Sequence, residues 1–149
     1  MACLKMILAR RTGEIHQVTA LAKEAAAYGG YVQKNGGIEG LFYKPFRSYV
    51  SERFGLEAVP MPALTVPRII RALGDGKDIM VSVTPEIRFP DRKPARHSGH
   101  LVLVVGYDLD EGTLFIHNPS GFFGRSQEMA PVSFTVFRRF FDHKGILIG

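Results

Sequence analysis

Residues 98–121 constrain the fold of this chain more than any other segment. They contain two β-rich runs, 101–105 and 113–116, on either side of a short turn rich in Asp and Gly. Two such runs around such a turn predict an antiparallel β-hairpin. The first strand begins at His100, and the second leads into an Asn-Pro-Ser-Gly turn that starts at Asn118.

Strand geometry brings His100 close to Asn118. If the turn is centred near Asp110, the numbers of paired positions sum to about 220, so Val102 lies opposite Asn118. Side chains alternate along a strand, so His100 shares a face with Val102 and is a diagonal neighbour of Asn118. A register shift of one residue would bring His117 to that place instead, and both alternatives remain open at this stage.

A histidine supported by an asparagine is typical of a general base. In the expected arrangement the asparagine accepts the Nδ1–H of His100, which leaves Nε2 to act on a nucleophile. Cys-His-Asn is one of the recurring catalytic triads. Its thiol would need to lie near a helix N-terminus, and Cys3, the one cysteine of the sequence, precedes apolar residues at helical spacing.

Each of these residues also has a purely structural interpretation. His100 can be a structural histidine at a strand end, Asn-Pro-Ser-Gly is a good turn in its own right, and Cys3 can be a small buried hydrophobe. The basic loop 85–98, which contains Arg88 and Arg96, is either solvated or a rim that binds acidic ligand groups. His97 and His100 have the spacing of metal ligands but lack a second pair, so no metal and no cofactor are expected.

Periodicity elsewhere predicts an α+β protein. Helices are expected from residue 4, over 15–28 and 45–54, after a cap at Thr65, and after a cap at Ser133, whereas strands are expected at 58–61, 78–83 and 146–148. Residues 29–40 are predicted to form a glycine-rich loop. N-terminal helices packed on an antiparallel sheet, as one domain spanning residues 1–149, are the expected architecture.

Composition excludes several classes of protein. The longest apolar runs have about six residues, whereas a membrane span needs about 20, so membrane insertion is not expected. A single cysteine and no visible signal peptide favour a cytoplasmic location. The net charge is +5, but the basic residues are spread along the chain, so nucleic-acid binding is not expected.

Three segments together resemble a known family. Ala-Cys-Leu-Lys-Met-Ile-Leu at 2–8, Ser-Gly-His-Leu-Val-Leu-Val-Val-Gly-Tyr-Asp at 98–108 and the turn at 118–121 resemble papain-like cysteine peptidases that cut double-glycine leaders from bacteriocins (peptidase family thirty-nine), in stand-alone form. The resemblance implies a papain-like fold and hydrolysis of a peptide bond in a peptide or protein substrate through an acyl-enzyme. It implies His100 as the base, with Asn118 where the family usually has an aspartate.

The same resemblance raises a question about the nucleophile. Cys3 matches the second half of the family segment whose reactive cysteine lies four residues earlier, which predicts a reactive cysteine upstream of Met1 and a printed sequence that is N-terminally short. The alternatives are Cys3 as a shifted nucleophile, an inactive domain that binds a peptide or acidic partner, and a related amidase or acyltransferase. The upstream coding frame tests the first expectation.

Overall fold

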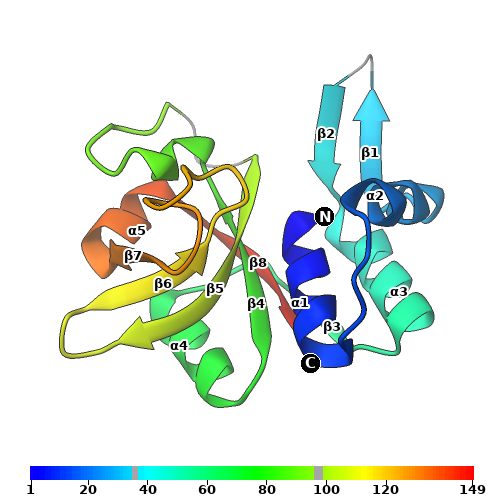
Figure 1. Cartoon of the computed structure of the whole chain (residues 1–149), viewed down its shortest axis with the longest axis horizontal. Helices are drawn as coiled ribbons and strands as arrows, with labels where there is room; N and C mark the ends of the chain where they lie inside the picture. Colours follow the sequence, from blue (N-terminus) through cyan, green and yellow to red (C-terminus); the bar gives the residue numbers. More distant parts are fainter. Residues whose placement is uncertain (35–36, 96–98) are drawn as a thin grey trace. The chain divides into compact units, whose positions relative to one another are not determined.

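The computed structural model describes residues 1–34, 37–95 and 99–149. These residues divide into two compact units, which are described separately: Met1–Pro60 with Ile148–Gly149, and Met61–Leu147. Figure 1 draws the first unit mainly in blue and cyan and the second in green through red. That residues 1–149 form one domain stays a prediction.

The first unit contains three helices and a small hairpin within its described residues. Its elements are α1 (Ala2–Thr12), α2 (Val18–Ala27), β1 (Tyr31–Lys34), β2 (Gly37–Leu41), α3 (Tyr43–Phe54) and most of β3 (Ala58–Met61). Helix α1 has no side-chain hydrogen bond at its N-terminal cap. It ends at Gly13, whose φ of 75° is the left-handed conformation that glycine adopts without strain.

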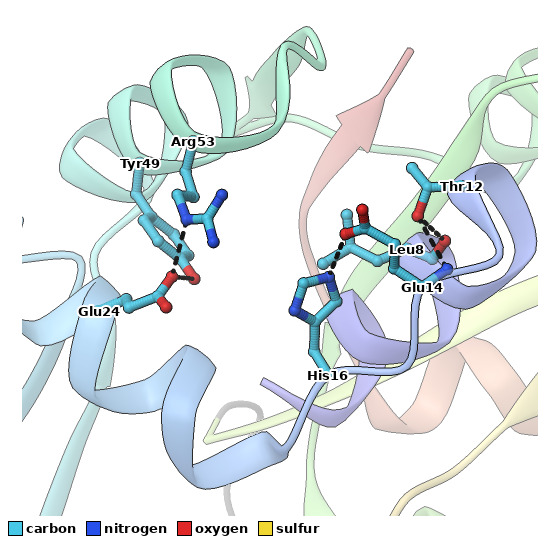
Figure 2. A network of polar contacts seen from close by, with 7 residues as sticks. All are labelled: Leu8, Thr12, Glu14, His16, Glu24, Tyr49 and Arg53. Carbon is cyan, nitrogen blue, oxygen red and sulfur yellow. Dashed lines mark hydrogen bonds and ion pairs between the residues drawn. The ribbon is translucent and has the colours of Figure 1, made fainter.

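The second helix is shorter than its apolar spacing predicts. Helix α2 begins at Val18, and Ile15 is 79% exposed, so the prediction of a helix from residue 15 was wrong at its start. The connection before α2 is held by local hydrogen bonds instead. The Thr12 hydroxyl donates to the Leu8 carbonyl and accepts from the Glu14 amide, at 2.9 and 3.2 Å, as Figure 2 shows.

The predicted glycine-rich loop at 29–40 is instead largely an antiparallel hairpin. Tyr31 pairs with Leu41, and the register shifts between Val32 and Gln33. One glycine is required for packing: a Cβ on Gly30 would lie 2.9 Å from the Phe46 amide nitrogen of α3. Glycines here therefore mark a bulged strand pair and a close backbone approach, which composition alone does not separate from a loop.

A polar cluster joins α2 to α3 within this unit. The hydroxyl of Tyr49 donates to Oε2 of Glu24 at 3.1 Å, and the Arg53 guanidinium lies 3.4 Å from the same oxygen (Figure 2). Burial, and then this hydrogen bond, raise the pKa of Tyr49, so its hydroxyl stays protonated and donates at neutral pH.

The second unit is built on an antiparallel meander. Its elements are α4 (Val66–Gly74), β4 (Asp78–Val83), a 3₁₀ turn η1 (Pro85–Arg88), β5 (His100–Asp108), β6 (Thr113–His117), β7 (Ala130–Ser133), α5 (Phe134–Phe140) and β8 (Phe141–Ile148). These strands lie in the order β8-β4-β5-β6-β7, and the successive pairs from β4 to β7 are antiparallel. The predicted α+β class is confirmed.

Local signals in the second unit agree with the structure in most places. The hydroxyls of Thr65 and Ser133 cap α4 and α5 as predicted, and every residue of β4 is buried. The last strand starts at Phe141, not at Ile146, because Phe141 already has extended backbone angles. The side chain of Phe141 is buried in the core of the unit.

One face of the sheet carries the hydrophobic core of the second unit. Val81, Val102 and Ile116 come from three neighbouring strands and pack with Ile69 of α4 and Phe137 of α5. Burial of each such side chain contributes about 1.5–3 kcal/mol. His100 pairs with Val83 at the end of this face, so the core fixes the strand that carries it.

Candidate active site

A β-bulge decides which side chain meets His100. On the turn side of the bulge, Gly106 pairs with Phe115, but the register shifts at Val105, so that Leu103 pairs with His117. Without this extra residue, alternation would place His117 on the face of His100. With the extra residue, Asn118 lies on the face of His100 instead. Of the two registers that the sequence left open, the one that places Asn118 near His100 is observed.

His100 and Asn118 are hydrogen-bonded at the end of the hairpin. Nε2 of His100 lies 2.7 Å from Oδ1 of Asn118. Asn118 is 1% exposed, whereas His100 is partly buried. The expected roles of the ring nitrogens are therefore reversed: Nε2 is held by the amide, and no hydrogen bond within the described residues engages Nδ1.

Ser120 completes this cluster, although the sequence pattern did not predict a role for it. Its backbone amide donates to Oδ1 of Asn118 at 3.1 Å, and its hydroxyl lies 3.1 Å from Nε2 of His100 and 3.3 Å from that Oδ1. An Asn whose side chain accepts from the amide two residues later is an Asx turn. The Asn-Pro-Ser turn sequence was therefore the signal that could have identified Ser120.

The loop after Asn118 is held by its own backbone. The Asn118 amide donates to the Gln127 carbonyl at 2.7 Å, and the Asn118 carbonyl accepts from the Gly121 amide at 2.9 Å. A Cβ on Gly121 would overlap the Ser126 carbonyl, so only glycine fits there. These contacts fix the backbone at Asn118.

The environment of His100 keeps its ring neutral near pH 7. Burial lowers the pKa of His100, the hydrogen bond to Asn118 partly opposes this effect, and the positive charge of Arg88 lowers the pKa further. A neutral ring that donates Nε2–H to Asn118 has its lone pair on Nδ1. That nitrogen is the one able to accept a proton.

Asn118 leaves part of its amide unused. Among the described residues, its buried Nδ2 has no hydrogen-bond partner, while Oδ1 makes the contacts with His100 and Ser120. A buried donor without a partner costs about 1–3 kcal/mol. The position therefore suits an acceptor-only side chain, such as an aspartate, at least as well as it suits asparagine.

Of the two arginines predicted to bind substrate, Arg88 and Arg96, the structure describes only the first. Arg88 lies beside the cluster, and its Nη1 donates to the Ser120 carbonyl at 3.4 Å. Arg96 lies outside the described residues, and so does His97, the partner of His100 in the metal-ligand alternative. Within the described ranges, no group of three or more His, Cys, Asp or Glu side chains is arranged to hold a metal ion.

Cys3 lies in α1 of the first unit and is 2% exposed. Burial raises the pKa of its thiol to about 12, so the thiol is protonated at neutral pH. A nucleophilic cysteine needs the opposite shift. The structure thus brings His100, Asn118 and Arg88 together and describes Cys3 in surroundings that disfavour its thiolate.

None of the helices in the described ranges combines the length and apolar character that a bilayer span requires. The helices described above have between 7 and 12 residues.

Comparison with known proteins agrees with the fold. Residues 1–142 match the Peptidase_C39 like family, and no curated protein matches the chain. Among solved structures, a Bacillus anthracis protein provisionally described as a C39-like peptidase is similar, with a TM-score of 0.69 and 14% identity. The match covers 99% of this chain and 86% of that one. With residues 1–142 matched, the chain belongs to the Peptidase_C39 like family.

Proposed function

We propose that this protein is a papain-like thiol hydrolase that cleaves a peptide bond through an acyl-enzyme. The observation that carries the proposal is the 2.7 Å contact between Nε2 of His100 and Oδ1 of Asn118, which orients a neutral imidazole with Nδ1 available. His100 is the general base, and Asn118 is the residue that positions it. Membership of the family supports a peptide or protein as the substrate.

The steps follow from this arrangement. Nδ1 of His100 accepts the proton of a cysteine thiol, and the thiolate attacks the carbonyl carbon of the peptide bond. The tetrahedral intermediate collapses as the imidazolium donates that proton to the departing amine, which leaves a thioester. His100 then takes a proton from water, which hydrolyses the thioester and regenerates the thiol. Asn118 accepts from Nε2–H throughout and stabilises the imidazolium.

Cys3 is the candidate thiol within the printed sequence, and its burial works against that role. The same observation favours a second candidate function, a peptidase-like domain that binds a peptide or acidic partner without cleaving it. In either case the single cysteine, which leaves no intrachain disulfide to form, suits a reducing compartment such as the cytoplasm.

Incubation of the purified full chain with a peptide mixture, followed by mass spectrometry, tests the proposal. We expect new peptide termini that disappear once Cys3 is fully alkylated by prolonged treatment with iodoacetamide, because the buried thiol reacts slowly. Cys3→Ala identifies the thiol, because loss of cleavage in that variant assigns the reaction to Cys3. Absence of cleavage, or cleavage that persists after every thiol is alkylated, would overturn the thiol hydrolase and leave the binding domain.

A further inference from the structure

A cavity of about 520 Å³ opens in the second unit, next to the loop that follows Asn118. Its lining comes from residues 87–92, from residues within the 122–133 segment, and from Ile116 and Val136. His100, Asn118 and Ser120 do not line it. Its volume falls in the range of about 300–1,000 Å³ that is typical of ligand sites.

Three arginines give this cavity an excess of positive charge. Arg88, Arg92 and Arg125 line it, together with a single carboxylate, that of Asp91. Within the described part of the chain, none of the three guanidinium groups lies within ion-pair distance of a carboxylate. Guanidinium groups bind carboxylates through two parallel hydrogen bonds, and no carboxylate of the described residues competes with a ligand for these three groups.

An aromatic wall adjoins these charges. The rings of Phe89 and Phe122 meet edge to face with their centroids 5.2 Å apart, and Phe122 is 42% exposed. The Arg92 guanidinium lies 4.1 Å from the centre of the Phe89 ring. Stacking on Phe89 limits the freedom of Arg92, so less entropy is lost when it binds a ligand. The cavity therefore offers apolar surface beside cationic groups.

We propose that this cavity binds an acidic peptide segment, with a carboxylate side chain on the arginines and a neighbouring apolar side chain against Phe89 and Phe122. A small inorganic anion would use the charge but not the aromatic wall, so the lining favours a peptide. Insofar as this peptide is the substrate, the inference rests on the proposed function.

Arg88 connects the cavity to the candidate active site. It lines the cavity and also donates to the carbonyl of Ser120, whose hydroxyl contacts His100. A carboxylate bound to Arg88 would lie next to the loop that holds the His100–Asn118 pair. A peptide held in the cavity is thus placed beside the residues that would process it.

Calorimetric titration of the full chain with two peptides tests this assignment. The probes are acetylated and amidated Glu-Phe-Glu and its neutral counterpart Gln-Phe-Gln. We expect the acidic peptide to bind about tenfold more tightly. Arg125→Gln should remove about that advantage, while Arg138→Gln, an exposed arginine of α5 outside the cavity, should change the affinity by less than about twofold. Both variants lose one positive charge, so a difference between them cannot come from net charge.

Three results would overturn the proposal: equal binding of the two peptides, equal effects of the two variants, or displacement by inorganic phosphate combined with undiminished binding of Glu-Ala-Glu. The last result would assign the cavity to a phosphate-type anion. Arg125→Lys keeps the positive charge but loses the planar guanidinium group. Its affinity for Glu-Phe-Glu should therefore lie between those of the wild type and Arg125→Gln. Binding is measured directly, so failure of peptide hydrolysis leaves this test unaffected, and failure of binding leaves the hydrolase proposal standing.

Discussion

Nε2 of His100 lies 2.7 Å from Oδ1 of Asn118, and a single bulged residue of β5, Val105, places the two side chains on one face of the sheet. Core packing fixes the strand that carries His100, and the Asx turn to the Ser120 amide fixes the side chain of Asn118.

His100 should titrate below the ordinary histidine pKa of about 6.5, since burial outweighs its hydrogen bond to Asn118. Asn118→Ala removes the interaction that raises the pKa and should lower it further. Arg88→Gln removes a nearby positive charge and should raise it. The pH dependence of the His100 ring signals in NMR spectra measures all three. A midpoint above that of an unfolded-chain histidine would contradict this prediction.

The same shift sets the sign of a stability change with pH. Because the folded pKa of His100 is lowered, the unfolded chain binds more protons between the folded pKa and about 6.5. The His100 contribution to the free energy of unfolding is therefore complete above about pH 6.5 and is lost as the pH falls through that window. Urea unfolding of the wild type and His100→Gln at several pH values isolates the His100 contribution. An identical pH dependence of stability in the two proteins would refute this prediction.

Asn118→Asp should raise the pKa of His100, because a carboxylate stabilises the imidazolium that an amide only orients. The carboxylate also removes the buried Nδ2, which has no partner within the described residues. NMR titration is again the measurement, with Asn118→Ala as the matched comparison. If Asn118→Asp leaves the pKa of His100 unchanged or lowers it, the side chain at position 118 does not face His100 in solution.

Some of this site could be predicted from the sequence because its determinants are local. Strand alternation and the two caps at Thr65 and Ser133 depend on neighbouring residues, and they were predicted correctly. The bulge at Val105 was not predicted, and the register near Asn118 agreed with the prediction only because of it. The side-chain torsion angles of His100 decide which of its ring nitrogens faces Asn118. Residue spacing in the sequence does not determine these angles.

The errors in the first unit have a related cause. Apolar spacing identified a helical face that included Ile15, but whether a face is buried depends on the element that covers it. Residues 29–40 were interpreted by their glycines as a loop, although Gly30 is needed for contact with Phe46 of α3. Both features depend on packing partners distant in the sequence.

Ser120→Ala should destabilise the fold by about 0.5–1.5 kcal/mol, because it removes a hydroxyl that contacts both members of the pair. It should also shift the pKa of His100. The loss of a contact that is only structural would leave this pKa unchanged. Ser51→Ala, at an exposed position of α3, is the control and should change the stability by less than about 0.5 kcal/mol. Equal unfolding curves and equal His100 titrations for the wild type and Ser120→Ala would argue against this role.

Cys3 should react with iodoacetamide more slowly than a small-molecule thiol, since burial both shields it and raises its pKa to about 12. Denaturant should restore the ordinary rate. Labelling followed by mass spectrometry at pH 6 and pH 8 measures this reactivity. Rapid labelling at pH 6 that disappears in His100→Gln would show instead that Cys3 is the activated nucleophile.

The central claim is that His100, held by Asn118, performs the proton transfers of a thiol hydrolase. The most direct measurement compares the rates of peptide cleavage by the wild type, His100→Gln and His117→Gln. The two histidines lie on the paired strands β5 and β6. The ring of His100 is hydrogen-bonded to the side chain of Asn118, whereas Nδ1 of His117 accepts from the Met129 amide. We expect His100→Gln to lose about 10²–10⁴-fold and His117→Gln to retain nearly the full rate. Equal rates for the two variants, or undiminished cleavage by His100→Gln, would contradict the claim.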